Sequence, residues 1–215
     1  RMRVLANAAN AGCSTARNQG IAAATGDRIV FVDNDVTVRS RNWLGRLSGL
    51  LDADPAIGMV GPKLVYPVAP YRIQFAGGAV SRTGRVQFLG RGAAIDDSRF
   101  NVRREVQYLI SACCMTRRSV LEQAGGFDEA FNPVQFEDTD LCYRIREKGY
   151  RILFEPAVEM YHYESSTTAG TAALPNSALV VRHGLLFKQR WMRMVEKEDG
   201  PPDSAIAWHP IPLPS

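Results

Sequence analysis

The chain has 215 residues, of which 46% are hydrophobic and 22% are charged, and its formal net charge is +4. This composition is that of an ordinary globular protein and excludes a disordered or collagen-like chain. The net charge is small and the basic residues are scattered, so we expect no nucleic-acid partner.

The predicted elements alternate between helices and strands, as in an α/β fold. Capping by Ser14 or Thr15 predicts a helix that reaches Ala24, and the apolar run 28–32 predicts a buried strand. The glycine-rich segment 73–92 predicts a hairpin. Further helices are expected at 43–51, 118–123, 139–148 and 179–195, and further strands at 57–60, 64–66, 106–115 and 151–154.

The cysteines and the hydropathy pattern indicate in which cellular compartment the protein is expected. The four cysteines lack the spacing of a metal site, so we expect reduced thiols in the core (Cys13, Cys113, Cys114 and Cys142). No apolar run approaches the roughly 18 residues of a membrane span, and the first residues do not resemble a signal peptide. We therefore expect a cytoplasmic location.

The segment Asp33-Asn34-Asp35 follows the predicted strand 28–32 directly. In open α/β sheets, ligands bind beyond the carboxyl ends of the strands. In an extended segment the two aspartates would point the same way, about 7 Å apart. They could then hold a divalent cation, ribose hydroxyls or both. The alternative is a polar turn with Asn34 in a left-handed conformation.

Three carboxylates, those of Glu137, Asp138 and Asp140, stand at the start of the predicted helix 139–148, where the helix dipole favours negative charge. Capping and an ion pair between Asp140 and Arg144 would explain part of this pattern. Glu137 and Asp138 are expected in the loop before the helix, where a carboxylate could act as a general base toward a substrate hydroxyl. From the residues alone, both interpretations remain open.

Three further polar residues are candidates with an ordinary alternative. His162 lies between two tyrosines, where a packed histidine is more common than a ligand, but beside a carboxylate site its imidazole would suit Mn²⁺ better than Mg²⁺. Arg17 and Asn18 follow Gly12 on a predicted helix, at an expected ligand face or simply on the helix surface.

Together these motifs resemble the family 2 glycosyltransferases, and most closely the bacterial rhamnosyltransferase-like members that build surface polysaccharide. The similarity runs in family order from about residue 7 to residue 170. Its motifs are Asn10-x-Gly12-x4-Arg17-Asn18-x-Gly20, Ile29 to Asp35, Gly125-Gly126-Phe127-Asp128-Glu129, Glu137-Asp138-x-Asp140-Leu141-x-x-Arg144, Gly149-Tyr150 and His162.

The resemblance implies an inverting, metal-dependent enzyme of the GT-A fold, an α/β fold with a mixed sheet flanked by helices. Asp33-Asn34-Asp35 stands at the family's DXD motif, so Asp35 is expected to bind Mn²⁺ or Mg²⁺, and Asp33 is expected to bind the ribose or a metal-bound water. His162 would complete the metal site. Asp138 stands where the family has its catalytic base, with Glu137 supporting it.

The same resemblance implies the partners. Arg17, Asn18 and Asn34 would approach the nucleotide diphosphate of a sugar donor, and Asp128 and Glu129 would border the acceptor cleft. The acceptor would be a saccharide or a lipid-linked sugar, which implies peripheral contact with the inner face of the plasma membrane.

The sequence departs from the family at its start, where the family has a strand, a helix and a second strand that bind the nucleobase. We therefore expect an incomplete catalytic domain at 1–170, a helical extension at 171–199 and an extended or disordered proline-rich tail at 200–215. An incomplete sheet edge could pair with a second copy in a homodimer. The alternative function is a non-catalytic carbohydrate-binding or scaffold module of the same fold.

Overall fold

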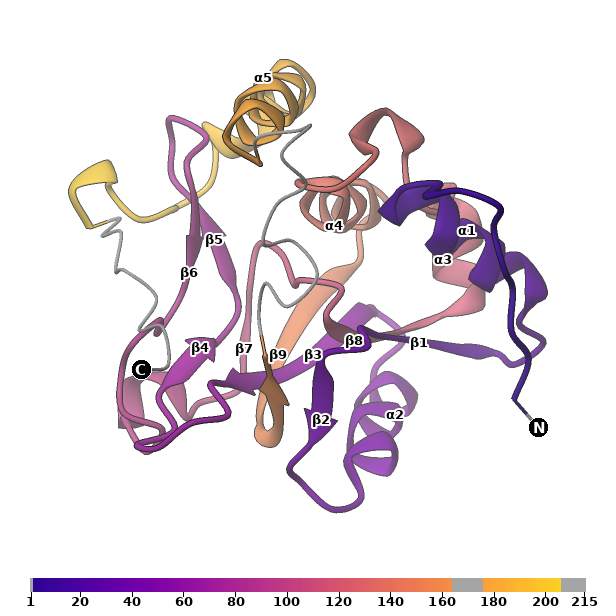
Figure 1. The fold of residues 1–215 in the computed structure, drawn as a ribbon. Coiled ribbons are helices and arrows are strands. Elements are labelled where there is room, and N and C mark those ends of the chain that lie inside the picture. The colour runs from indigo at the N-terminus through magenta and orange to yellow at the C-terminus, as the bar shows by residue number, and fades with distance from the viewer. Residues whose placement is uncertain (1, 164–175, 206–215) are drawn as a thin grey trace.

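The computed structural model describes residues 2–163 and 176–205 (Figure 1). Its centre is a seven-stranded mixed sheet, which confirms the predicted sheet type. Five strands follow one another in the order β1 (Arg28–Val32), β8 (Cys113–Arg117), β3 (Ile57–Val65), β9 (Arg151–His162) and β2 (Val36–Val38), with β4 (Ile73–Phe75) on β3 and β7 (Arg104–Glu105) on β9. Of the described pairs in this sheet, only β3 and β9 run parallel.

Helices cover both faces of the sheet (Figure 1). One face carries α2 (Trp43–Ala53), and the other carries α1 (Cys13–Ala23), α3 (Arg118–Ala124) and α4 (Glu137–Glu147), with α5 (Asn176–Val195) on the outside of α4. Two apolar clusters fill these layers. The smaller one packs α2 on the sheet through residues such as Leu47, Leu51 and Val60, and the larger one joins the sheet to α3, α4 and α5.

Two strands are longer than predicted, because β3 continues past Pro62 and β9 past Pro156. Proline cannot donate a ladder hydrogen bond, so prolines in a sequence suggest strand ends. Here the pairing of the two strands shifts register between Pro62 and Lys63, and Glu155 is followed in the pairing by Glu159. This irregularity accommodates both prolines inside the sheet.

Two other predicted strands differ from the structure. The strand expected at 106–115 is confined to β8, because residues 107–112 form a bridge and turns rather than a continuous strand. Conversely, β2 was not predicted, since three residues are too short for a pattern. The expected hairpin in 73–92 is present as β5 (Gly78–Val80) and β6 (Val86–Phe88).

The predicted capping of α1 is wrong. The helix begins after Gly12, whose φ is 85°, and neither Ser14 nor Thr15 caps it with a side chain. Instead the side chain of Asn132 accepts from the Ser14 N–H at 3.0 Å and donates to Thr15 Oγ1 at 2.8 Å. A side chain at Gly12 would collide with Asn132, so glycine is required at this close approach.

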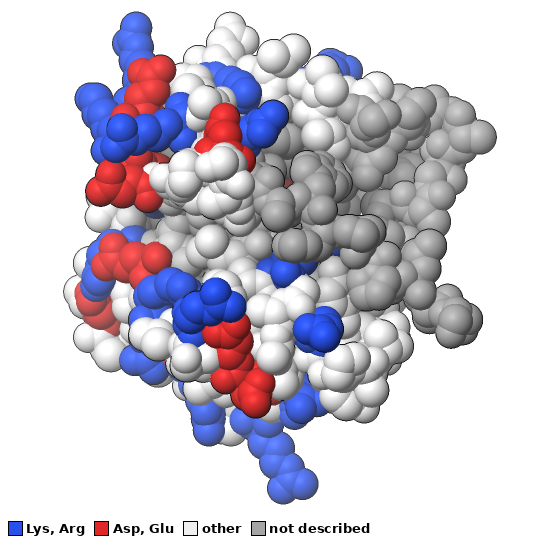
Figure 2. Space-filling view, turned by 90° about the vertical axis from the view of Figure 1, so that its left-hand side faces the viewer, with Lys and Arg blue, Asp and Glu red and all other residues white. Residues whose placement is uncertain are grey.

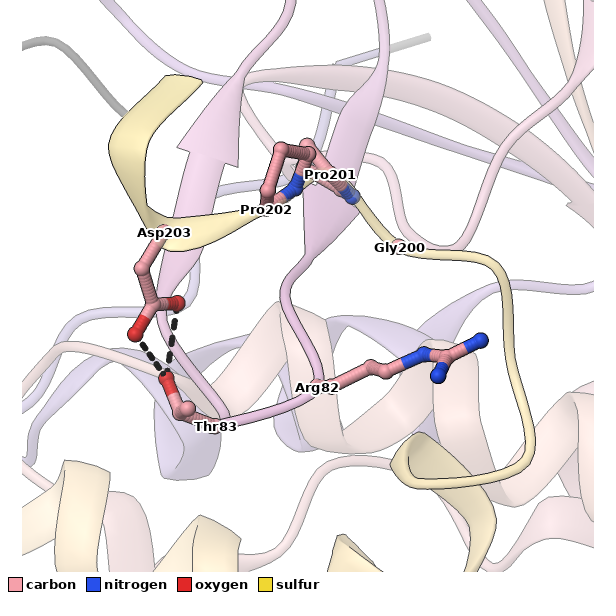
Figure 3. A pocket seen from close by; sticks show the side chains of 6 residues that line it. All are labelled: Arg82, Thr83, Gly200, Pro201, Pro202 and Asp203. Atoms are coloured by element: carbon pink, nitrogen blue, oxygen red, sulfur yellow. Dashed lines mark hydrogen bonds between the residues drawn. The ribbon is translucent and has the colours of Figure 1, made fainter.

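The segment after α5 packs on the β5–β6 turn (Figure 3). Thr83 Oγ1 donates to the carboxylate of Asp203 at 2.8 Å, and a hollow of about 500 Å³ lies between Arg82 and the prolines beside Gly200. Residues 203–205 form the 3₁₀ turn η3 rather than an extended chain, while 206–215 lie outside the described residues. Over this side of the molecule, charges of both signs lie next to one another (Figure 2).

All four cysteines are free thiols, as predicted, but the expected core position is wrong for Cys13, which is only half-buried, while the other three are buried. No helix in the described ranges is both long and apolar enough to cross a membrane. Two further short 3₁₀ turns are η1 (Ser98–Phe100), between β6 and β7, and η2 (Glu129–Phe131), between α3 and α4.

Candidate active site

Asp33, Asp35 and His162 meet where β1 and β9 end and β2 begins. One potential ligand atom from each side chain lies within 4.8 Å of the other two. The backbone holds both aspartates in place, because the Asp33 N–H donates to Ala112 O and the Tyr163 N–H donates to Asp35 O, each at 2.9 Å. These two backbone hydrogen bonds therefore fix the positions of the two residues that carry the carboxylates.

The connection between β1 and β2 is a turn, not the extended segment that we expected. The Val36 N–H donates to Asp33 O at 3.1 Å, which closes the turn. A carboxylate oxygen of Asp33 lies within 4.8 Å of one of Asp35 in this turn. The alternative, a polar turn, is therefore the one present, but Asn34 is not left-handed, since it is absent from the described residues with positive φ.

His162 is oriented by Gln74, which sequence reasoning missed. Gln74 is fully buried on β4, and its Oε1 lies 2.6 Å from His162 Nδ1, while its Nε2 donates to His162 O. Because the Gln74 oxygen can only accept, Nδ1 carries a proton, and in the neutral imidazole the Nε2 lone pair then lies on the side of Asp35, 3.4 Å away. Two carboxylates and one such imidazole nitrogen fit a divalent cation, and the imidazole favours Mn²⁺ over Mg²⁺.

Arg17 joins this cluster to the start of α4. Its Nη2 donates to Asp33 at 2.9 Å and its Nη1 donates to Glu137 at 3.1 Å, and the guanidinium also contacts the Cys13 thiol. Burial alone would lower the pKa of Arg17, but Cys13 and the nearby carboxylates raise it above its ordinary value. A permanent positive charge thus lies between the two acidic motifs.

Glu137 and Asp138 lie in the first turn of α4, not in the preceding loop as expected. Asp138 accepts from the Thr139 N–H at 2.7 Å and from the Ser111 N–H at 3.3 Å. Burial beside apolar side chains and the Glu137 charge raise the pKa of Asp138 to about 7, although Arg17 and the two N–H donors oppose this. A carboxylate poised near neutral pH can accept a proton from a hydroxyl.

The expected pair between Asp140 and Arg144 is present, and α5 adds to it. Asp140 is fully buried and accepts from Arg144 Nε at 2.7 Å and from Trp191 Nε1 at 2.9 Å. Arg190 also donates to Asp140, at 3.2 Å. The basic residues and tryptophan near the end of α5 therefore contact the helix that carries Asp138.

The other predicted site residues lie apart from this cluster or are bound within the fold. The Asn18 amide accepts from the Phe127 N–H and donates to Phe127 O, each at 2.8 Å, so it joins α1 to the Gly-Gly-Phe segment. Asp128 accepts from the Ala130 N–H and pairs with Arg190 at 2.6 Å. Glu129 is exposed on η2. Their ligand contacts stay predictions.

The fold is similar to that of a solved glycosyltransferase of the GT-A type. The crystal structure of GalNAc-T7 with UDP, GalNAc and Mn²⁺ superposes with a TM-score of 0.69 at 17% identity, over 90% of this chain and 38% of that one. The chain thus has the GT-A fold. The profile described as "Glycosyltransferase like family 2" matches residues 1–178, so the chain belongs to this family.

Several curated relatives are similar over most of the chain. A pre-mycofactocin glycosyltransferase of Mycobacterium tuberculosis is 33% identical over 75% of this chain and 32% of its own length. An N-acetylglucosaminyl-diphospho-decaprenol L-rhamnosyltransferase of the same species is 30% identical over 96% of this chain and 71% of its own length. An uncharacterized Sinorhizobium fredii protein, y4gI, is 32% identical over 89% of this chain, which spans 21% of its length.

Proposed function

We propose that this chain is the catalytic part of an inverting glycosyltransferase that moves a sugar, of the hexosyl type, from a nucleotide-diphosphate donor to an acceptor hydroxyl. The observation that carries the proposal is the placement of two acidic groups around one guanidinium. Asp33, with Asp35 and His162 beside it, lies on one side of Arg17, and the Glu137–Asp138 pair lies on the other.

The donor side of the site is the Asp33, Asp35 and His162 cluster. These residues would hold a divalent cation, which when bound supplies positive charge that stabilises the departing nucleoside diphosphate. Gln74 fixes the imidazole so that its free nitrogen faces the same space as the carboxylates. Arg17 neutralises Asp33 and limits the electrostatic cost of gathering carboxylates there.

The acceptor side is the first turn of α4. Asp138 takes the proton from the acceptor hydroxyl while the hydroxyl oxygen attacks the anomeric carbon from the face opposite the diphosphate. One bond to carbon forms as the bond to the diphosphate oxygen breaks, so a single displacement inverts the configuration. The raised pKa of Asp138 matches this role, because a proton acceptor works best when its pKa is near the ambient pH.

The names of relatives support a lipid-linked or saccharide acceptor in bacterial surface polysaccharide synthesis. One relative is named for a decaprenol-linked sugar, and another, 31% identical over 69% of this chain, is the Myxococcus xanthus O-antigen biosynthesis protein RfbC. A lipid-linked acceptor would require peripheral contact with a membrane. The chain spans 12% and 71% of the lengths of these two relatives.

A transfer assay tests this function. The protein is incubated with Mn²⁺, a panel of nucleotide sugars (dTDP-rhamnose, UDP-N-acetylglucosamine and GDP-mannose) and acceptors that include a short lipid diphosphate N-acetylglucosamine. Product linkage is then determined by NMR. We expect one donor to give a product of inverted anomeric configuration, and Asp138→Asn to lower its rate by roughly 10²- to 10⁴-fold. Retained configuration, or equal rates for the variant, would contradict the proposal.

A further inference from the structure

His183 is a fully buried histidine on α5 that has no place in the function proposed above. Its Nδ1 lies 3.0 Å from Val134 O and 3.1 Å from Gln135 O. Both partners are carbonyl oxygens and can only accept, so the ring proton lies on Nδ1 and is shared between them. Its Nε2 is buried and has no hydrogen-bond partner among the described residues. Within the described residues, the His183 ring therefore makes its hydrogen bonds only with the segment that leads into α4.

This segment is strained where His183 contacts it. Gln135 and Phe136 have φ values of 88° and 69°, in the left-handed region that non-glycine residues rarely adopt. Phe136 is the residue immediately before α4, and Glu137 and Asp138 follow it. Such conformations persist only when neighbouring contacts hold them. Those contacts therefore also determine where the first turn of α4 places its carboxylates.

Contacts from both sides hold the segment. On the α1 side, the Cys13 N–H donates to Pro133 O at 2.7 Å. On the α5 side, the Phe136 ring packs on Phe187 with 5.6 Å between ring centroids, and His183 donates to the carbonyls at 134 and 135. Among these α5 contacts, the bond from His183 is the directional one, because it specifies the orientation of two peptide groups and not only their packing.

We propose that His183 is a positioning residue, which holds the strained segment 134–136 and thereby sets the position of the Asp138 carboxylate relative to Asp33 and Asp35. The role in transfer rests on the function proposed above. The hold on the segment itself does not, since it follows from the hydrogen bonds and the backbone conformation. Through His183, α5 acts on the position of Asp138, although α5 contributes no residue to the Asp33, Asp35 and His162 cluster.

Two substitutions separate the hydrogen bond from simple packing. His183→Leu keeps a buried side chain of similar size but removes the donor. His183→Asn places an amide N–H close to where Nδ1 lies and should restore the donor. Val195→Ala is the matched control, because Val195 is fully buried at the far end of the same helix and its loss leaves a cavity without touching the segment.

The first readout is hydrogen exchange of the backbone amides at 134–140 in the whole protein, measured by mass spectrometry. We expect His183→Leu to accelerate exchange in this range, His183→Asn to exchange as the wild type does, and Val195→Ala to lower the melting temperature without a selective change there. Unchanged exchange in His183→Leu, or the same pattern in Val195→Ala, would overturn the proposal. This readout needs no substrate.

The second readout is kinetic, with the donor identified in the transfer assay. His183→Leu should lower kcat by roughly 10- to 100-fold with little change in the donor KM, because a small displacement of the base affects the transition state more than donor binding. His183→Asn should recover most of the rate. A wild type without transfer would reject the proposed function alone, and the exchange data would still decide the role of His183.

Discussion

Asp33 and Glu137 belong to motifs far apart in the sequence, yet their carboxylates accept hydrogen bonds from the same guanidinium, that of Arg17. The arginine was expected to contact the donor diphosphate. In the structure its side chain is largely buried, and two carboxylates and a thiol surround it. It therefore joins the donor side of the site to the acceptor side, and a direct contact with the donor stays a prediction.

Removing this guanidinium should affect stability and the base together. Arg17→Met leaves the buried Glu137 without its partner, which should lower the free energy of unfolding by about 3 kcal/mol. Because the Arg17 charge lowers the pKa of Asp138, its loss should raise that pKa further. Urea denaturation measures the first effect. Arg28→Met, which breaks an exposed pair with Asp52, is the control and should change stability little. Equal stability of the two variants would contradict a linking role.

The rate of transfer should fall in acid. The pKa of Asp138 is raised to about 7, and the protonated carboxyl cannot accept a proton from the acceptor. We expect kcat/KM to decline as the pH falls through about 7, with a slope of one proton. A profile that is flat between pH 5 and 8 would show that Asp138 is not the base or that its pKa is ordinary.

The same shift makes a prediction about stability with a defined sign. The folded-state pKa of Asp138 lies above the unfolded value, so the folded protein binds the proton more tightly. The resulting stabilisation is fully present below about pH 4 and is lost as the pH rises to about 7. Asp138→Asn should therefore match the wild type in acid and exceed it in urea stability at pH 8. Lower stability of the variant at pH 8 would contradict the burial of a charged Asp138.

Gln74 should control the affinity for metal. Gln74→Leu removes the acceptor for His162 Nδ1 and should weaken Mn²⁺ binding by roughly 10- to 100-fold in calorimetry. Gln74→Glu retains an acceptor at that position and should bind Mn²⁺ at least as well as Gln74→Leu does. Gln87→Leu, in the β5–β6 hairpin, serves as a control and should bind normally. Unaltered Mn²⁺ affinity in Gln74→Leu would remove His162 from the site.

The hydrogen bond between Trp191 and Asp140 should contribute to stability. Trp191→Phe keeps an aromatic ring but removes one of the donors to a fully buried carboxylate. Hydrogen bonds to charged groups typically contribute about 2 kcal/mol, and the free energy of unfolding should fall by that amount. Trp43→Phe, on α2, provides the comparison for loss of indole area. A loss no larger than that of Trp43→Phe would indicate that the indole N–H adds nothing.

Local sequence signals predicted the parts of the fold and site that depend on neighbouring residues. The strand 28–32, the helix around 43–51 and the grouping of acidic residues at strand and helix ends were all visible as patterns of neighbours. The local pattern did not show whether Asp138 lies in a loop or in a helix. Phe136 adopts a left-handed conformation, and α4 begins directly after it, two residues before the predicted start.

Long-range partners could not be predicted in this way. Asn132, Gln74 and His183 act through contacts with residues that are distant in the sequence, and each was an ordinary polar residue in its local context. The same is true of the prolines inside β3 and β9, whose tolerance depends on the register shift between the two strands. Contacts of this kind become visible only once the fold brings the distant segments together.

Calorimetry tests whether Asp35 binds a cation that in turn binds a nucleotide. The protein is titrated with UDP, GDP and dTDP, with and without Mn²⁺, alongside Asp35→Asn and Thr37→Ala, a control at an exposed position on the neighbouring strand β2. We expect that one nucleotide binds only with Mn²⁺, that Asp35→Asn abolishes this binding and that Thr37→Ala preserves it. Binding that is independent of Mn²⁺ and unchanged in Asp35→Asn would contradict this expectation.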